Sequence, residues 1–119
     1  MYGYSLLDYL IITGAMPEEN ARVIMKLLLK TIKIMHERGI THRDIKIDNL
    51  MFRQVDNSLE SICIIDFGAS RFMGTNNMAS SREGTKIYSC PQTVKKSRQT
   101  PYDSTKADVW TLGSVLFVL

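Results

Sequence analysis

The sequence predicts an α+β fold that is mainly helical and forms at most one domain. Apolar residues recur at spacings of three and four over 17–38, the pattern of one buried helix face. Two short apolar runs, 49–52 and 62–65, are separated by residues typical of turns, which favours a hairpin. The length of 119 residues leaves room for no second domain of ordinary size.

The composition excludes several classes of protein. The chain is 45% hydrophobic and 23% charged, so disorder throughout is excluded. A net charge of +3 is too small to indicate a nucleic-acid partner. The apolar run at 109–119 is shorter than the roughly 20 residues of a membrane span, so none is predicted. Two cysteines without a disulfide framework, and no signal peptide, favour the cytoplasm or nucleus.

Two helices are expected in the first third of the chain. A short one is predicted within 1–15 and ends near Gly14. A long one is predicted over 17–38, where Pro17 suits the first turn and Gly39 suits the end. The buried face predicted for the long helix consists of Ala21, Ile24, Met25, Leu28, Ile32 and Met35.

The rest of the chain divides into three parts. A short strand pair is expected over 50–65, with turn residues at 56–58. Residues 69–105 show no sustained periodicity and are rich in Gly, Asn, Ser and Pro, so a long surface segment is expected. The apolar run at 106–119 predicts the start of a buried helix, and its last four residues are expected to leave an apolar patch exposed.

Two motifs carry the functional signal: His-Arg-Asp-Ile-Lys-Ile-Asp-Asn over 42–49 and Asp-Phe-Gly over 66–68. Transfer of a phosphoryl group to a hydroxyl requires a proton acceptor, divalent cations on the phosphate oxygens and a cation that offsets the negative charge on the transferring group. Asp44 suits the first task and Lys46 the third. Asn49 and Asp66 suit the second, because Mg²⁺ prefers carboxylate and carbonyl oxygens.

These strings match H-R-D-x-K-x-x-N followed by D-F-G, so the chain resembles the protein kinase family, and Lys46 resembles its serine/threonine branch. The string Gly-Thr-Lys-Ile-Tyr-Ser-Cys-Pro-Gln at 84–92 resembles the end of a kinase activation segment, and 108–113 resembles the helix that anchors the large lobe. The resemblance implies part of a kinase large lobe, with the small lobe absent. Its parts are a post-hinge helix (1–15), a long helix (17–38), the catalytic loop (42–49), a short strand pair (50–65), the activation segment (66–92) and the start of the anchoring helix (106–119).

The resemblance also implies site roles. Asp44, Lys46 and Thr85 are expected to be catalytic. ATP is expected to contact Met51, beneath the adenine, together with Lys46, Asn49 and Asp66, and Asn49 and Asp66 are the expected Mg²⁺ ligands. The expected partner is a protein substrate with a serine or threonine acceptor.

Regulatory and supporting roles follow in the same way. Arg43 resembles the arginine that pairs with a regulatory phosphate, and Ser81 is the best-placed acceptor, ahead of Thr75 and Ser80. The resemblance places Asp108 as a brace for the backbone of the catalytic loop. It also stacks His42 with Phe67, which makes His42 structural and not a metal ligand.

Departures from the family pattern qualify the expected activity. Gln92 stands where the family has a glutamate, and no G-x-G-x-x-G precedes the catalytic loop. The string at 23–26 imitates the V-A-I-K lysine motif but lies inside the predicted long helix. The isolated chain is therefore expected to be inactive and poorly soluble.

Two functions remain open from the sequence. The first is a serine/threonine kinase portion that transfers the γ-phosphoryl group of Mg·ATP to a protein hydroxyl. The alternative is a non-catalytic truncated kinase that acts as a binding or decoy module. An in-frame glycine-rich loop and strand lysine upstream would favour the enzyme, and flanking stop codons would favour the module.

Overall fold

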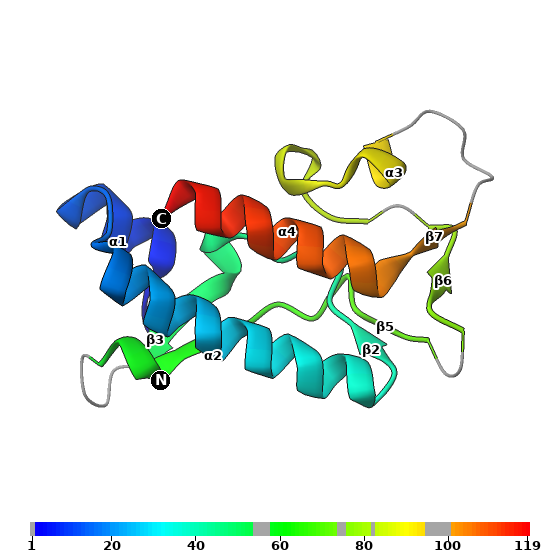
Figure 1. Cartoon of the computed structure of the whole chain (residues 1–119), viewed down its shortest axis with the longest axis horizontal. Coiled ribbons are helices and arrows are strands. Elements are labelled where there is room, and N and C mark those ends of the chain that lie inside the picture. Colours follow the sequence, from blue (N-terminus) through cyan, green and yellow to red (C-terminus); the bar gives the residue numbers. More distant parts are fainter. Residues whose placement is uncertain (1, 54–57, 74–75, 82, 95–100) are drawn as a thin grey trace.

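The computed structural model describes residues 2–53, 58–73, 76–81, 83–94 and 101–119, with no account of the Tyr2 side chain. It mixes helices with short strands, in agreement with the α+β class (Figure 1). The elements in chain order are β1 Tyr2–Ser5, α1 Leu6–Thr13, α2 Glu18–Glu37, β2 Ile40–Thr41, η1 Ile47–Asn49, β3 Leu50–Arg53, η2 Leu59–Ser61, β4 Ile62–Ile64, β5 Arg71–Phe72, β6 Met78–Ala79, η3 Lys86–Tyr88, α3 Pro91–Val94, β7 Tyr102–Asp103 and α4 Ser104–Val118, where η marks a 3₁₀ helix.

The two long helices, α2 and α4, pack side by side and run in opposite directions (Figure 1). The predicted apolar face of α2 is confirmed, because the same six residues are its buried ones. Helix α4 begins two residues before the expected 106, since the side chain of Asp103 accepts hydrogen bonds from the backbone N–H groups of Thr105 and Lys106 and caps the helix. No helix among the described residues is long and apolar enough to cross a membrane.

The prediction of a post-hinge helix over 1–15 was wrong for residues 2–5. Residues 2–5 form strand β1, which pairs antiparallel with β3 and extends the sheet to the order β1-β3-β4. Helix α1 begins only after Ser5, whose hydroxyl accepts from the N–H of Asp8 while the Asp8 carboxylate accepts from the N–H of Ser5. It ends before Gly14, as expected, where φ is +77°.

The expected hairpin is present, because β3 pairs antiparallel with β4, with Leu50 opposite Ile64 and Phe52 opposite Ile62. Its bounds differ slightly from the predicted runs: Asn49 lies in the 3₁₀ turn η1, and Ile65 lies beyond β4. The predicted turn at 56–58 lies outside the described residues except for Ser58, which caps η2.

The long surface segment predicted for 69–105 carries more structure than expected. Strand β5 pairs with β2, β6 pairs with β7, and η3 and α3 lie between β6 and β7 along the chain. Each of these strands has only two residues, too few for a sequence period to appear. These pairings tie the segment to the start of α4 and to the chain just before residue 42.

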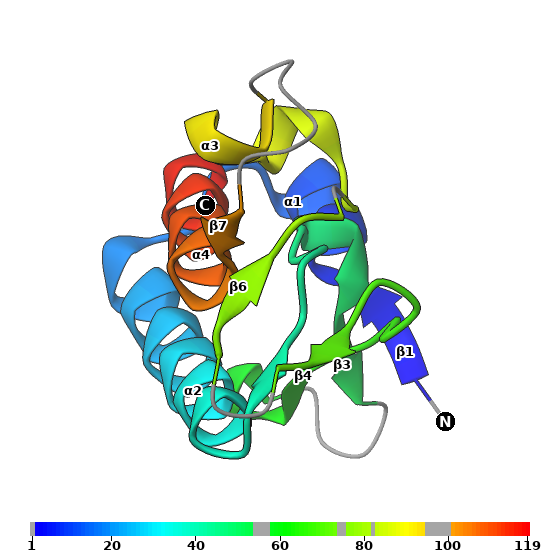
Figure 2. The same ribbon diagram turned by 90° about the vertical axis from the view of Figure 1, so that its right-hand side faces the viewer.

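Two groups of buried side chains hold these elements together. The larger joins α2 and α4 to the hairpin and to the chain at 45–47; its central members include Ile24, Leu28, Ile32, Ile45, Leu50, Phe52, Leu112 and Val115. Figure 2 shows the two helices on one side and strands β1 and β3 on the other. The smaller group, formed by Met73, Ala79, Cys90, Tyr102 and Ala107, packs the segment after residue 66 against the start of α4.

Candidate active site

The candidate site begins with a buried carboxylate on α4 that holds the loop at 42–49. Asp108 is fully buried; its Oδ2 accepts from the backbone N–H of His42 at 2.9 Å, and its Oδ1 accepts from that of Arg43 at 2.8 Å. Arg43 has φ +68°, a left-handed conformation that non-glycine residues rarely adopt. The two hydrogen bonds from the backbone N–H groups to Asp108 hold the chain in this conformation, so the next residue, Asp44, points toward the segment at 66–92.

Asp44 is the centre of the site. Its Oδ1 accepts from the backbone N–H of Thr85 at 2.8 Å and from the Thr85 hydroxyl at 2.9 Å. Burial alone would raise the pKa of Asp44, but the Thr85 hydrogen bonds and the nearby Lys46 ammonium outweigh it and lower the pKa below its usual value. The group is therefore a carboxylate at neutral pH, and within the described residues its Oδ2 has only longer contacts, at 3.5 Å to Lys46 Nζ and 3.4 Å to Asn49 Nδ2.

Lys46 and Thr85 complete a compact polar cluster. Lys46 Nζ donates to the Thr85 hydroxyl at 3.0 Å, and this hydroxyl donates in turn to Asp44. The ammonium and the carboxylate thus share one threonine, which fixes both side chains. The arrangement places a proton acceptor and a cation side by side.

Asn49 and Asp66, the predicted Mg²⁺ ligands, are brought together by the backbone. The N–H of Ile65 donates to the carbonyl of Asn49 at 2.9 Å, so Asp66 follows directly after a residue bonded to Asn49. Asn49 donates its side-chain nitrogen to the Asp44 carbonyl at 2.9 Å, and Asp66 Oδ1 accepts from the Gly68 N–H at 3.1 Å. This leaves Asn49 Oδ1 and Asp66 Oδ2 without a donor among the described residues.

Those two oxygens fit a magnesium ion, because they are hard donors and Mg²⁺ takes few protein ligands. Asp66 has φ +60°; it and Arg43 are the two non-glycine residues with positive φ in the described part of the chain. Arg43 directly precedes Asp44, and Asp66 follows the residue bonded to Asn49, so both left-handed residues lie at the site. The described residues hold no group of three or more His, Cys, Asp or Glu side chains that could bind a metal ion.

His42 has a structural environment. Its ring lies 5.0 Å from the Phe67 ring in an edge-to-face arrangement, the stacking that was expected. Burial lowers the pKa of His42 despite the carboxylates of Asp108, Asp44 and Asp66 nearby. The neutral ring suits its neighbours, since Nδ1 can accept from the Asp44 N–H and Nε2 can donate to the Ile65 carbonyl.

Arg43 connects the loop to Ser81. Its Nε donates to the Ala69 carbonyl at 2.7 Å, and its Nη1 donates to the Ser81 hydroxyl at 2.7 Å. The hydroxyl of Tyr102 donates to the Ser81 carbonyl at 3.1 Å. Ser81 is therefore held at the guanidinium, whereas Ser80 is exposed and Thr75 lies outside the described residues.

The backbone of the segment approaches that of the loop closely at Gly84, where φ is +97°. A Cβ atom there would lie 2.3 Å from the Arg43 carbonyl oxygen and 3.4 Å from Asp44 Oδ1. A glycine is needed at this position because φ is positive and because a side-chain carbon would collide with the Arg43 carbonyl.

The structure thus brings Asp44, Lys46, Asn49 and Thr85 into one cluster, with Asp66 beside it. Met51 lies half-buried in β3, opposite Cys63, outside this cluster of hydrogen bonds.

Sequence reasoning missed three contributing residues: His36, Gly84 and Tyr102. His36 Nε2 lies 2.9 Å from Asp108 Oδ2, and the two residues are 72 positions apart, so no local pattern indicates this contact. Gly84 could have been found from its place before Thr85 in the matched string, because glycine there indicates a backbone constraint.

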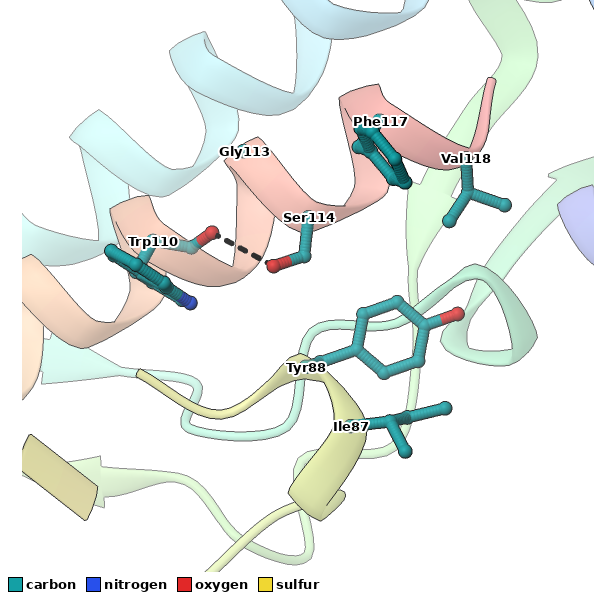
Figure 3. Close-up of a pocket in the computed structure, with 7 residues that line it drawn as sticks. All are labelled: Ile87, Tyr88, Trp110, Gly113, Ser114, Phe117 and Val118. Atoms are coloured by element: carbon teal, nitrogen blue, oxygen red, sulfur yellow. Dashed lines mark hydrogen bonds between the residues drawn. The ribbon is translucent and has the colours of Figure 1, made fainter. Parts of the chain in front are cut away.

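An apolar groove lies next to the site. It has a volume of about 490 Å³ and lies between η3 and the second half of α4. Ile87 and Tyr88 face Trp110, Phe117 and Val118 across it (Figure 3). The expected exposed patch at the carboxyl end is present for Leu116, Phe117 and Val118, with Phe117 92% exposed. The prediction was wrong for Leu119, which packs on the core and whose carbonyl accepts a hydrogen bond from the backbone N–H of Met16.

Comparisons with known proteins agree with this geometry. A family model described as the protein kinase domain matches residues 1–119. Serine/threonine-protein kinase cds1 of Schizosaccharomyces pombe is 35% identical over 121 residues, covering 98% of this chain and 25% of that protein. Meiosis-specific serine/threonine-protein kinase mek1 of the same yeast is 31% identical, with 98% and 28% covered. Sperm motility kinase 3A of Mus musculus is 37% identical, with 98% and 22% covered.

The chain spans about a quarter of the length of these relatives. Within that span, the family model covers every residue. Asp44, in the first matched motif, contacts Thr85, and Gly84 lies against Arg43, so the string at 84–92 meets the loop that carries the motif. On this evidence the chain belongs to the protein kinase family.

Proposed function

We propose that the chain is the catalytic-loop and activation-segment portion of a serine/threonine protein kinase, which transfers the γ-phosphoryl group of Mg·ATP to a protein hydroxyl. The observation that carries the proposal is the Asp44 carboxylate, held at Oδ1 by Thr85 and flanked at Oδ2 by Lys46. A proton acceptor next to a cation is what transfer to a hydroxyl requires.

In this proposal, Asp44 orients the acceptor hydroxyl and takes its proton at Oδ2, the atom with the longer contacts. Lys46 offsets the negative charge on the transferring group. Thr85 holds both side chains in place, because its hydroxyl accepts a hydrogen bond from Lys46 and donates one to Asp44.

Asn49 Oδ1 and Asp66 Oδ2 are the atoms that would hold magnesium. When bound, the ion would neutralise charge on the phosphate oxygens. Met51 in β3 would contact the adenine from below. The left-handed backbone of Asp66 supports this proposal, because strained residues gather at sites where geometry matters.

A regulatory phosphate on Ser81 is part of the proposal. The Ser81 hydroxyl already lies 2.7 Å from Arg43 Nη1, so a phosphate there would form charge-assisted hydrogen bonds with the guanidinium. Ser81→Ala is expected to remove activation by an upstream kinase, and Ser80→Ala, at the exposed neighbour, is expected to leave it intact.

The test is phosphate transfer to a serine/threonine peptide by the full translated protein that contains this chain. Asp44→Asn and Asp66→Ala are each expected to lower turnover by about 10²–10⁴-fold, the range for loss of a general base. Asp103→Asn is the matched control, since asparagine caps a helix as well as aspartate. Near-normal rates in either site variant, with the fold intact, would refute the assigned roles.

The isolated 119-residue chain is expected to show no measurable transfer, because its sequence holds no glycine-rich loop or strand lysine before His42. Stoichiometric transfer by the purified monomer, abolished by Asp66→Ala, would contradict this expectation. If the full protein is also inactive but binds other proteins, the alternative of a binding or decoy module gains support, with the groove between η3 and α4 as its first candidate surface.

A further inference from the structure

Two adjacent serines of the segment at 66–92 have opposite surroundings. The Ser81 hydroxyl accepts a hydrogen bond from Arg43 Nη1 at 2.7 Å, whereas Ser80 is exposed. Successive side chains of an extended chain point to opposite faces, so a shift of one residue would exchange the two serines. Because both carry the same hydroxyl group, the hydrogen bond to Arg43 does not by itself select Ser81. The selection requires contacts elsewhere in the segment.

The pairing of β6 with β7 supplies such contacts. Ala79 lies opposite Tyr102, and Ser104 donates both its backbone N–H and its hydroxyl to the Asn77 carbonyl, each at 2.9 Å. Ala79 is 2% exposed and belongs with Tyr102 to the smaller group of buried side chains. A shift of one residue would place the Ser80 hydroxyl in this group, and a buried hydroxyl without a partner is costly. The pairing therefore favours one register.

Tyr102 also holds the end of this stretch. Its backbone lies opposite Ala79, and its hydroxyl donates to the Ser81 carbonyl at 3.1 Å. The residue is only 5% exposed, and burial raises the pKa of its hydroxyl despite the Arg43 guanidinium nearby. The hydroxyl therefore carries its proton at neutral pH and can donate it to the carbonyl. The phenol thus holds the Ser81 backbone at the point where the Ser81 side chain meets Arg43.

We propose that Tyr102 is a positioning residue, whose hydroxyl fixes the Ser81 carbonyl so that Ser81, and not Ser80, faces Arg43. The regulatory meaning of this contact rests on the proposed function, in which Ser81 carries a phosphate. The measurements below use neither a phosphate nor phosphate transfer, so each idea can fail without the other.

The first measurement follows hydroxyl exchange in the full translated protein, labelled with ¹³Cζ-tyrosine, in a mixture of H₂O and D₂O. A hydroxyl that exchanges slowly gives separate ¹³Cζ signals for its two isotopes. We expect the Tyr102 hydroxyl to exchange at least about tenfold more slowly than that of Tyr9, which has no hydrogen-bond partner among the described residues. Each signal is assigned by the tyrosine-to-phenylalanine variant that lacks it. Equal exchange rates at the two positions would overturn the proposal.

The second measurement is a double-mutant cycle of Tyr102→Phe and Ser81→Ala in the same full protein, observed at the Nε–H of Arg43. This group donates to the Ala69 carbonyl, while Ser81 binds Nη1 of the same guanidinium. The cycle is made in a Ser80→Ala background, so that Ser80 cannot take the place of its neighbour. Each single variant is expected to accelerate hydrogen exchange of the Nε–H by about threefold to tenfold, the factor for one lost hydrogen bond.

The double variant is expected to exchange within about twofold of Ser81→Ala, because both changes remove the same contact with Arg43. Tyr9→Phe is the matched control: it removes a hydroxyl from a ring that packs on Phe52 in the larger buried group, and it should leave the Arg43 signal unchanged. An unchanged rate in Tyr102→Phe would mean that only the ring matters. Accelerations that multiply in the double variant would mean that the hydroxyl acts independently of Ser81. Either result would overturn the proposal.

Discussion

The loop at 42–49 and the segment at 66–92 meet at Asp44, yet they are held in different ways. The loop is anchored in the core: Ile45 and His42 are fully buried, and Asp108 binds its backbone from α4. The segment leaves large apolar side chains in solvent, with Phe72 73% and Ile87 84% exposed. Its links to the loop include the ring contact of Phe67 with His42 and polar contacts through Thr85 and Ser81.

Because the loop and the segment are held differently, changes in the loop should lower the stability of the whole fold, whereas changes in the segment should alter its position against the loop. Burial of the loop makes its conformation part of the global fold, so damage there should unfold the chain. The segment meets the loop through one ring contact, a few hydrogen bonds and one close backbone approach, so damage at this junction should release the segment from the loop while the core survives. The four changes below test this separation, from the largest expected effect to the smallest.

Asp108→Ala should have the largest effect, because it leaves the backbone amides of His42 and Arg43, and the ring of His36, without their acceptor. We expect the free energy of unfolding to fall by about 3–5 kcal/mol, as when one partner of a buried pair is removed. Urea denaturation followed by circular dichroism measures it. Asp103→Ala, which removes the cap of the same helix, should cost only about 1 kcal/mol. Equal losses in both would show that the loop is not held through Asp108.

Gly84→Ala should act on the segment. The new methyl group would collide with the Arg43 carbonyl at a φ of +97°, so we expect a cost of about 1–3 kcal/mol and faster proteolysis within 66–92. Gly113→Ala is the matched control, because a Cβ there meets no atom within 4 Å, and alanine in a helix should stabilise by roughly 0.5–1 kcal/mol. Slower proteolysis of Gly84→Ala would contradict the close contact.

Thr41→Val should stabilise the core next to the loop. Thr41 is 1% exposed, and its hydroxyl has no hydrogen-bond partner within the described part of the chain. Valine has the same shape without the unpaired hydroxyl, so we expect the free energy of unfolding to rise by about 1 kcal/mol. A thermal melt measures the gain, and a loss in Thr41→Val would reveal a partner for the hydroxyl.

Thr85→Val should have the smallest effect on stability and a visible effect on titration. The pKa of Asp44 lies below its unfolded value, so its contribution to stability is present above the unfolded pKa and is lost as pH falls through the folded pKa. Valine removes the hydroxyl donor, so the pKa of Asp44 should rise toward its ordinary value, and the loss of stability should be smaller and complete at a higher pH. A ¹³C titration of the Asp44 carboxyl measures this. Thr85→Ser, which keeps the donor, should titrate like the parent.

Much of this architecture was predictable because it depends on local periodicity. The buried face of α2 followed from the spacing of its apolar residues, and the hairpin followed from two short runs and a turn. Strand β1 was not predictable, because its four residues gain their partner from β3, some fifty positions along the chain. The same is true of the two-residue pairings of β2 with β5 and of β6 with β7.

By itself, the sequence determined the family, because Asp44, Lys46, Asn49 and Asp66 stand in two strings that match its motifs, and it predicted phosphoryl transfer from the chemistry of those side chains. Only the tertiary structure decided how those groups are held. Asp108 receives His36 from α2 as well as two amides of the loop, and Gly84 lies against the Arg43 carbonyl. The family resemblance had indicated the brace of the loop by Asp108, but no local pattern indicated its contact with His36, because contacts between distant residues arise only when helices and loops pack.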